Sequence, residues 1–454
     1  MDEGPQRVAV IGAGPSGLYA AAALHTAGAG VSVDVLDRLP APYGLVRYGV
    51  APDHIKMKNV IRVLQRPFAG DPPVRFLGNV TVGEGGVPLD ALRRHYHAIV
   101  HATGSSVDRP LGVPGEELAG SLGSGAFVSW YSGHPDFTKL DPPLDQPGVA
   151  VVGAGNVALD VARVLAKSAE EMAATDIPDF VLEALRVSAV RDIHVLVRRG
   201  PQHVKFTPAE LHQIGDIAGV DVVVRDETGL LTPELVEAET DKRQRQNLRM
   251  MLDWSRREPD GRAARRIHLR FLRSPVRLVG EDGRVRSVVV RRGALDRHGR
   301  VVPTGEEETL DAGLVVRAIG YSAEPVPGLP FDERTGTVPH EGGRVVCDGV
   351  PVPGAYVTGW IKRGPTGIIG TNKADGTETA NAVLADLPTL PAPAAPDPED
   401  LAATLAAHGV RPVDWTAWLR LDAEELRLGA TRGGTERVKV AELAAMLDAC
   451  RAPD

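Results

Sequence analysis

The sequence is poor in cysteine. Cys347 and Cys450 are the two cysteines among 454 residues, and they lie about a hundred positions apart. This usage excludes a disulfide framework, a zinc knuckle, a CxxC redox pair and a cysteine-ligated iron–sulfur cluster. No metal site is expected, and any electron chemistry must use an organic cofactor.

The chain also lacks the segments that membrane insertion or export would need. We find no apolar run of about 18 residues or more, the length that predicts a membrane-spanning helix. The first residues include Asp2 and Glu3 and reach a predicted strand by Val8, which leaves no basic and apolar leader. The net charge of −8 is moderate and mixed along the chain, so the whole protein does not resemble a nucleic-acid binder. We expect a soluble, cytoplasmic protein of about three domains.

Glycine, by contrast, is abundant, with 50 residues. The first glycines that form a recognisable binding motif follow a predicted strand at residues 8–11. Gly12, Gly14 and Gly17 form a GxGxxG motif between that strand and an alanine-rich predicted helix. Backbone N–H groups at such a helix N-terminus can bind a pyrophosphate. Asp37 ends the next predicted strand, where a carboxylate can accept hydrogen bonds from a free ribose. The alternative is an ordinary glycine turn with a surface aspartate.

The same pattern recurs in the middle of the chain. A predicted strand at residues 149–152 leads into Gly153, Gly155 and Ala158, the GxGxxA variant of the motif. The chain therefore contains two nucleotide-binding openings. The strand after the second one, residues 193–197, ends in basic residues instead of an acid.

These basic residues, Arg198 and Arg199, decide which ligand the second opening is expected to bind. Two guanidinium groups can hold a 2′-phosphate, whereas a carboxylate at that position would repel it by roughly 1 to 4 kcal/mol. We therefore expect NADP(H) in the second opening; the alternative is a solvated arginine pair. A chain with an acid at one ribose position and arginines at the other most economically binds FAD and NADPH together.

The two openings predict an α/β protein with two Rossmann-like dinucleotide-binding domains, the first discontinuous, plus a small helical C-terminal appendage. Predicted strands at 98–102 and 314–319 are each followed by a glycine, and we expect the chain to cross between the domains near these points. The expected bounds are 1–105 and 331–386 for the FAD-binding domain, 106–330 for the NADP-binding domain, 387–400 for a Pro-rich linker and 401–454 for the helical tail.

Hydride transfer requires the nicotinamide C4 to approach the flavin N5 to roughly 3 to 3.5 Å. Candidate segments for that junction are residues 44–54, 156–160 and 360–370. Within the last of these, Gly364 to Ile368 predicts a loop entering a helix, where backbone N–H groups can face a flavin or its pyrophosphate.

Several longer strings resemble one family when they are read together. They are GLVRYGVAPDH at 44–54, GNVALDVAR at 155–163, VRRGP at 197–201, FTPAEL at 206–211 and GWIKRGPTGIIGTN at 359–372. Over residues 5–386 the chain resembles the ferredoxin–NADP reductases of the adrenodoxin reductase type. A tryptophan follows the glycine of the last string, where flavoenzymes of the disulfide-reductase type have an aspartate, and this argues against that other class.

The resemblance implies a flavoprotein that takes hydride from NADPH and gives single electrons to a small iron–sulfur protein. The residues that it implies for FAD, together with the first motif, are Gly12, Gly14, Ser16, Gly17, Asp37, Leu45, Val80, Trp360, Gly367, Ile368 and Ile369. Those that it implies for NADPH, together with the second motif, are Arg109, Gly153, Gly155, Asn156, Val157, Ala158, Arg198, Arg199, Glu210 and Gly367.

The resemblance also places His54 and Asp160 as a polar pair beside the flavin and nicotinamide, with Glu210 nearby. A histidine titrates near neutrality and could move protons as the flavin cycles between two-electron and one-electron states. The alternative is that His54 only shapes the pocket, since hydride transfer needs no acid or base. Asp160 has an alternative too, as an acid near a helix start that the helix dipole stabilises.

Local charge predicts where the electron acceptor docks. Between Lys242 and Arg273 the sequence has eleven Lys or Arg residues and few acids. Such a basic face on the NADP domain could steer an acidic ferredoxin toward the flavin, and a merely solvated helix is the alternative.

Two other functions stay open from the sequence. A flavin oxidase or monooxygenase would pass the electrons to oxygen, and a nucleotide-sensing or partner-binding module would bind the cofactors without turnover. A glutamate synthase small subunit is disfavoured because two cysteines cannot build its cluster domain.

Overall fold

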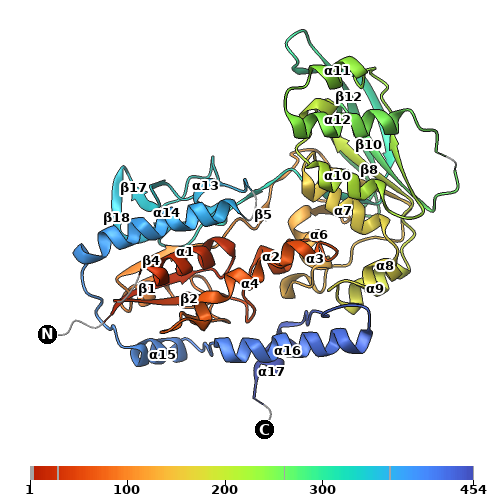
Figure 1. Cartoon of the computed structure of the whole chain (residues 1–454). Coiled ribbons are helices and arrows are strands. Elements are labelled where there is room, and N and C mark those ends of the chain that lie inside the picture. The colour runs from red at the N-terminus through yellow and green to blue at the C-terminus, as the bar shows by residue number, and fades with distance from the viewer. Residues whose placement is uncertain (1–4, 28–29, 260, 368–369, 453–454) are drawn as a thin grey trace. The chain divides into compact units, whose positions relative to one another are not determined.

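The computed structural model describes residues 5–27, 30–259, 261–367 and 370–452 (Figure 1). The chain forms two compact units. Unit 1 comprises Met1–Val50, His54–Val107 and Tyr321–Asp454, and unit 2 comprises Ala51–Asp53 and Asp108–Gly320. The chain passes between the units near residue 107 and residue 320, and the tail belongs to unit 1. Among the described residues, no helix is long and apolar enough to cross a membrane.

Unit 1 is built on a seven-stranded sheet in which five consecutive strands, from β18 to the edge strand β3, are parallel, and the other two pair antiparallel at the opposite edge. Strand β1 is buried on both faces: Val8 and Val10 pack into one hydrophobic cluster, and Ala9 and Ile11 pack into another. A strand covered on both sides reads as a continuous apolar run, as this one does. In spatial order the strands are β16 (His340–Glu341), β17 (Arg344–Cys347), β18 (Val350–Val357), β4 (Ala98–His101), β1 (Gln6–Ile11), β2 (Val31–Leu36) and β3 (Arg75–Leu77).

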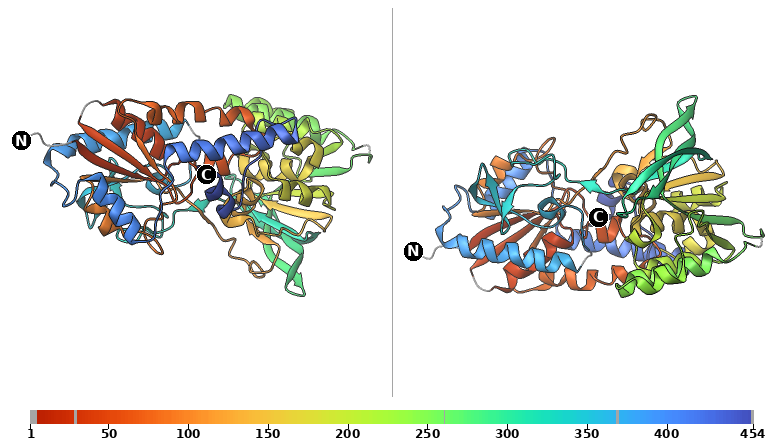
Figure 2. Two further views of the ribbon diagram at one scale, coloured as in Figure 1. Left: turned by 90° about the horizontal axis from the view of Figure 1, so that it is seen from below. Right: turned by 90° about the horizontal axis from the view of Figure 1, so that it is seen from above.

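Two helices pack on one face of this sheet. Helix α1 (Pro15–Thr26) follows β1, and α14 (Thr371–Asp386) lies beside it (Figure 2). A Cβ at Gly376 of α14 would lie 2.8 Å from the backbone N of Ala20, so glycine permits the close approach of the two helices. Short helices connect the remaining parts: α2 (Leu45–Tyr48), α3 (Ile55–Lys58), α4 (Ile61–Leu64), α5 (Leu89–Arg93) and α13 (Trp360–Arg363).

The C-terminal tail packs into the core of unit 1. It comprises α15 (Pro398–Ala407), α16 (Trp415–Arg432) and α17 (Leu443–Cys450). The Trp415 ring stacks on Phe68 at 4.3 Å between centroids, and Val413 exchanges two backbone hydrogen bonds with Gly78. The Pro-rich segment before the tail is also held, because Arg7 donates to the Pro396 carbonyl. The expected appendage is therefore an integral layer of unit 1.

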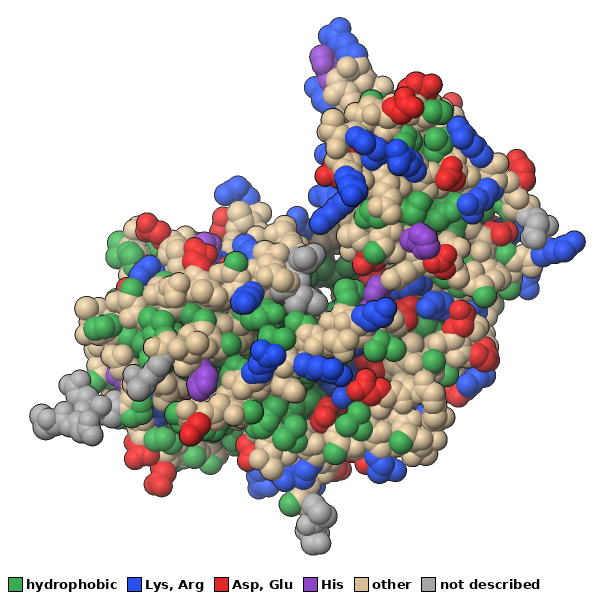
Figure 3. All heavy atoms as spheres, viewed as in Figure 1, with side chains coloured by type: hydrophobic (Ala, Val, Ile, Leu, Met, Phe, Trp, Pro, Cys, Tyr) green, Lys and Arg blue, Asp and Glu red, His purple; other side chains and the backbone are tan. Residues whose placement is uncertain are grey.

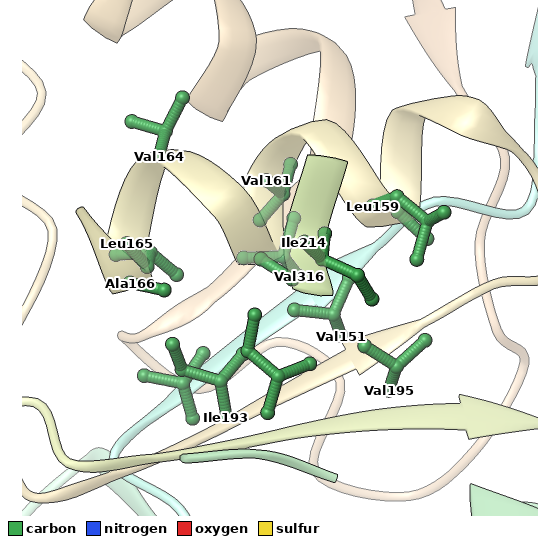
Figure 4. Close-up of a cluster of buried hydrophobic side chains, with 14 of the residues drawn as sticks. Val151, Leu159, Val161, Val164, Leu165, Ala166, Ile193, Val195, Ile214 and Val316 are labelled. Atoms are coloured by element: carbon green, nitrogen blue, oxygen red, sulfur yellow. The ribbon is translucent and has the colours of Figure 1, made fainter. Parts of the chain in front are cut away.

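Unit 2 has three layers. Its central six-stranded sheet is parallel, in the order β6 (Ser121–Gly123), β14 (Leu314–Arg317), β7 (Gly148–Val152), β8 (Asp192–Val197), β10 (Arg265–Phe271) and β9 (Val220–Val224). One face packs on helices that include α7 (Asn156–Ala166), α10 (Pro208–Gly215) and α12 (Lys242–Ser255). Figure 4 shows side chains of α7 and α10 meeting those of β7, β8 and β14 in this core. The other face packs on an antiparallel sheet of β11 (Arg273–Glu281), β12 (Arg284–Leu295) and β13 (Val301–Asp311).

The packing of α16 can be tested at adjacent positions. Trp418 is buried and meets the Tyr43 ring edge-on, whereas Leu419 is 45% exposed. We expect Trp418→Ala to lower the free energy of unfolding of unit 1 by about 3–5 kcal/mol, and Leu419→Ala to change it by about 0.5 kcal/mol or less. Denaturant titration measures both, and equal losses would show that the tail is not part of the core.

Candidate functional site

The three glycines of the first motif have different geometric roles in unit 1. Gly12 has φ 110°, and a Cβ there would lie 2.4 Å from the Ala102 carbonyl oxygen. A Cβ at Gly17 would lie 2.0 Å from the Gly12 oxygen, so this position needs glycine for close packing. At Gly14, by contrast, a Cβ would meet no atom of the described residues within 4 Å, and α1 has no side-chain cap there. The turn thus leaves backbone N–H groups and open space where a pyrophosphate can bind.

Asp37 joins this turn to the end of β2. Its carboxylate accepts hydrogen bonds from the backbone N–H of Ala13 at 2.7 Å and of Leu39 at 2.9 Å. Burial raises the pKa of the Asp37 carboxyl, and the two N–H donors oppose this shift. The side chain remains partly exposed, so its oxygens keep acceptor capacity for a ribose hydroxyl. Val80, which is buried, donates its N–H to the Asp37 carbonyl and fixes the same strand end.

The segment that follows Tyr43 lies directly on the turn. Tyr43 donates its N–H to the Ala13 carbonyl at 2.8 Å, and a Cβ at Gly44 would lie 2.9 Å from the Gly14 Cα. Leu45 is 44% exposed on this segment, while the next residues of α2 are buried. His54 is also buried, at the start of α3 in unit 1.

The GWIKRGPTG string forms a second wall in unit 1, fixed by one buried acid. Asp375 accepts a hydrogen bond from the Gly359 N–H at 2.7 Å and pairs with Lys362 Nζ at 2.6 Å. Trp360 stacks on Tyr321 at 6.1 Å between ring centroids. Gly367 has φ 87°, and Ile368 and Ile369 lie outside the described residues.

Ser16 connects the first turn to α14. Its hydroxyl donates to the Asn372 side-chain oxygen at 3.0 Å, and a Cβ at Gly359 would lie 2.3 Å from the Ser16 Oγ. The structure therefore brings together, within unit 1, the expected FAD residues from the first motif, the Gly44 segment and the Trp360 string.

The second motif repeats the geometry in unit 2. A Cβ at Gly153 would lie 2.5 Å from the Ala318 carbonyl oxygen, whereas one at Gly155 would meet nothing within 4 Å. Helix α7 begins at Asn156 without a side-chain cap. The Asn156 Oδ1 instead accepts the Thr207 N–H at 2.8 Å, which holds the FTPAEL segment beside the turn. Ala158 is fully buried, and Val157 packs partly against the core.

Arg198 and Arg199 follow the end of β8 as exposed side chains. Within the part of the chain that the structure describes, neither guanidinium has a hydrogen-bond or ion-pair partner. Both are therefore available to an anion, in contrast to Asp37, whose carboxylate is already hydrogen-bonded to the turn.

The remaining candidates of the NADP site have distinct settings. Glu210 on α10 is buried, and its Oε2 has no hydrogen-bond partner among the described residues. Arg109 is exposed, and its backbone N–H donates to the Gly320 carbonyl. Asp160 and Glu210 belong to unit 2 and His54 to unit 1, so the joining of these three residues remains a proposal. No group of three or more His, Cys, Asp or Glu that could hold a metal occurs in the described ranges.

Sequence reasoning missed a buried charge cluster in unit 2. Arg163 on α7, which is 1% exposed, donates from Nε and Nη2 to both carboxylate oxygens of Asp53, at 2.7 and 2.9 Å. Its Nη1 donates to the Asp160 carboxylate at 2.7 Å, and Lys167 Nζ approaches Asp53 at 2.9 Å. One guanidinium thus fixes both Asp160 and the residue that precedes His54. Both strings were noted in the sequence, but nothing local indicates that they pair.

Ten of the eleven basic residues between Lys242 and Arg273, all except Arg262, fall into two groups. Five arginines are bound within unit 2: Arg245, Arg265, Arg266, Arg270 and Arg273. Five exposed residues on α12 and just after it have no partner among the described residues: Lys242, Arg243, Arg249, Arg256 and Arg257. We call these five the α12 patch; Lys and Arg side chains gather on the face of unit 2 drawn in Figure 3.

The similarity to known proteins extends over nearly the whole chain. Residues 10–72 match the family model of the NAD(P)-binding Rossmann-like domain. The chain is 42% identical to NADPH-ferredoxin reductase FprA of Mycobacterium tuberculosis, over 98% of both chains. The chain belongs to the ferredoxin–NADP reductases of the adrenodoxin reductase type.

Two further comparisons support this membership. Human mitochondrial NADPH:adrenodoxin oxidoreductase is 39% identical over 95% of this chain and 89% of its own length. A solved structure of M. tuberculosis FprA in complex with NADPH superposes with a TM-score of 0.89, at 40% identity and over 98% of this chain and 99% of that one. The resemblance predicted from the sequence motifs is therefore confirmed, as is the α/β fold with Rossmann-like domains.

The Asp53–Arg163 pair gives this family member a testable pH dependence. Burial raises the pKa of Asp53, but the hydrogen bonds and charges of Arg163 and Lys167 outweigh it and hold the pKa well below its usual range. We expect Asp53→Asn to lower the free energy of unfolding of unit 2 by about 3 kcal/mol at pH 7, the low end for a broken buried pair, because Asp160 still pairs with Arg163.

The sign of the pH effect follows from the lowered pKa. The stabilisation from ionised Asp53 is present above the unfolded-state pKa of about 3.9 and is lost as pH falls toward the folded-state pKa. The stability gap between wild type and Asp53→Asn should therefore narrow below about pH 4, as denaturant titration measures. The control, Asp145→Asn at an exposed position, should match the wild type, and a gap that is constant with pH would contradict the account.

Proposed function

We propose that this chain is a FAD-containing NADPH:ferredoxin oxidoreductase, which passes hydride from NADPH to FAD and then single electrons to an iron–sulfur ferredoxin. The observation that supports this most directly is the pair of glycine turns. One is braced by an acid at the ribose position, and the other is followed by two arginines that have no partner in the part of the chain that the structure describes. Family membership over 98% of the chain supports the same assignment. FAD, when bound, supplies the chemistry that links a two-electron donor to a one-electron acceptor.

The residues of unit 1 fit the FAD dinucleotide. The Gly12–Gly17 turn supplies N–H groups and the open space at Gly14 for the pyrophosphate. Asp37 accepts ribose hydroxyls, Leu45 offers an apolar contact, and buried Val80 borders the site through its backbone beside Asp37. Ser16, Trp360 and Gly367 to Ile369 complete the proposed FAD site. In this assignment residues 1–105 and 331–386 form the FAD domain, and 106–330 form the NADP domain.

The residues of unit 2 fit a phosphorylated nicotinamide coenzyme. The turn at Gly153 and Gly155, with Asn156, Val157 and Ala158 at the start of α7, receives the pyrophosphate. Arg198 and Arg199 bind the 2′-phosphate. Arg109 and Glu210 complete the part of the proposed NADPH site that lies in unit 2. The Glu210 Oε2, which has no hydrogen-bond partner among the described residues, is an acceptor for an amide or hydroxyl of the coenzyme.

His54, Asp160 and Glu210 are the proposed polar groups at the flavin–nicotinamide junction. Arg163 orients Asp160 and holds Asp53, so the peptide that leads into His54 is fixed at its Asp53 end. The His54 imidazole, which has a nitrogen that can accept and a nitrogen that can donate, is in this proposal a group that can exchange a proton with the flavin. We also propose a cytoplasmic location. Its support is that Cys347 and Cys450 are both free thiols, and a reducing compartment keeps thiols in this state.

Coenzyme preference tests the central assignment. We expect Arg198→Gln/Arg199→Gln to weaken NADPH binding by about ten- to several-hundredfold and to leave NADH binding almost unchanged, because only NADPH carries the 2′-phosphate. Steady-state KM values for both coenzymes, with ferricyanide as acceptor, measure the change. Arg191→Gln, at an exposed arginine just before β8, is the control. An unchanged preference for NADPH over NADH in the double variant would contradict the assignment of the NADPH site to unit 2.

The α12 patch is the proposed docking surface for an acidic ferredoxin. We expect Lys242→Gln/Arg249→Gln/Arg256→Gln to slow ferredoxin reduction by about tenfold at low salt and to flatten its dependence on ionic strength. Stopped-flow mixing of reduced enzyme with ferredoxin measures this rate.

The control for this experiment carries the same loss of charge elsewhere, in Lys139→Gln/Arg191→Gln/Arg411→Gln. It should keep a rate close to that of the wild type. Equal slowing in both triple variants would exclude a local docking surface. Rapid NADPH consumption with peroxide release and no need of a carrier would instead favour a flavin oxidase or monooxygenase.

A further inference from the structure

The tail of unit 1 contains a buried acid that reaches the cofactor-side segment. Glu425 on α16 is fully buried, and its carboxylate forms a two-point pair with Arg47 of α2, in which Nη1 donates to Oε2 at 2.9 Å and Nη2 donates to Oε1. Arg47 is itself 5% exposed, and its guanidinium lies 5.4 Å from the Trp418 ring centroid. A buried pair of this kind is costly to break, because the remaining charge is left without a partner in the interior.

The tail arranges further groups around this pair. The Val440 N–H donates to Glu425 Oε1 at 2.9 Å, and Arg437 Nη1 lies 3.4 Å from Oε2. Lys439, which is 3% exposed, sends its Nζ to the Arg47 carbonyl at 3.0 Å. The tail therefore binds both the side chain and the backbone of Arg47.

The segment that Arg47 belongs to lies between the tail and the dinucleotide turn. Tyr43 has φ 84°, a left-handed backbone that a tyrosine adopts only when its surroundings enforce it. Trp418 contacts the Tyr43 ring from the tail side, and the Ala13 carbonyl accepts the Tyr43 N–H from the turn side. Gly44 follows, in contact distance of Gly14.

We propose that the C-terminal helix pair, α16 and α17 with the link at residues 433–442 between them, is a clamp that sets the Tyr43–Tyr48 segment against the FAD site, with Glu425 as its positioning residue. The proposal rests on the FAD assignment above. It gives the tail a role in cofactor retention: the clamp keeps Gly44 on the Gly14 turn and presents Leu45, which the structure leaves 44% exposed, to the flavin side.

The experiment compares two adjacent acids of α16 in the full-length chain. Glu425→Gln keeps the shape of the side chain and removes the charge that pairs with Arg47. Glu424→Gln, the control, removes a partly exposed acid that pairs with Arg427 on the same helix. Each protein is stripped of flavin and titrated with FAD alone, and bound FAD is then examined by visible circular dichroism at saturating FAD.

We expect Glu425→Gln to weaken FAD binding by about tenfold or more, and to change the visible dichroism of the flavin that is still bound. Glu424→Gln should match the wild type in both. Binding of 2′,5′-ADP, which reports on unit 2 alone, should be equal in all three proteins. If Glu425→Gln does not fold, Lys439→Met replaces it, because it removes the contact to the Arg47 carbonyl and leaves the Arg47–Glu425 pair in place. Its effect should have the same direction and a smaller size.

If the folded variant has the FAD affinity and dichroism of the wild type, the clamp is overturned, even if its thermal stability is lower. A contact that is purely structural would lower stability without changing the flavin environment. Failure of the wild type to bind FAD is a different result and would overturn the proposed function itself.

Discussion

The close approach of a ligand to bare backbone at two turns is the constraint on which the rest of the structure depends. At Gly14 and Gly155 a side chain would enter open space, whereas at Gly12, Gly17 and Gly153 it would strike backbone within the fold. The helices that begin at these turns have no side-chain caps, so their first N–H groups remain for an anion. Each turn follows the carboxyl end of an inner parallel strand that is buried on both faces, and this strand fixes its position.

The two turns are similar, but the charged residues beside them have opposite signs and differ in whether they are already hydrogen-bonded. Asp37 is partly buried and hydrogen-bonded to the turn, so it braces the turn, and in the proposed FAD site it also accepts a ribose hydroxyl. Arg198 and Arg199 are exposed and without partners among the described residues, so a phosphate gains charge-assisted hydrogen bonds without breaking existing ones. This difference explains how one chain can keep two related dinucleotides apart.

The sequence predicts the parts of this account that are local. Glycine spacing, the residue at the end of the following strand and the family strings identify both turns and the family without any coordinates. The pairs that fix the site are distant in sequence, as with Asp53 and Arg163 or Arg47 and Glu425, and no periodicity reveals them. The basic region shows the same limit, because composition cannot distinguish Arg273, buried between two glutamates, from exposed Arg249. The tail looked like an appendage for this reason too, since its partners lie almost 400 residues away.

The most direct measurement of the central claim is the visible spectrum of the purified protein under anaerobic conditions, before and after addition of equal amounts of NADPH or NADH. The account predicts flavin absorption bands in the isolated protein that NADPH bleaches rapidly and NADH bleaches far more slowly. A protein that binds no flavin, or whose flavin is bleached equally by both coenzymes, would contradict it.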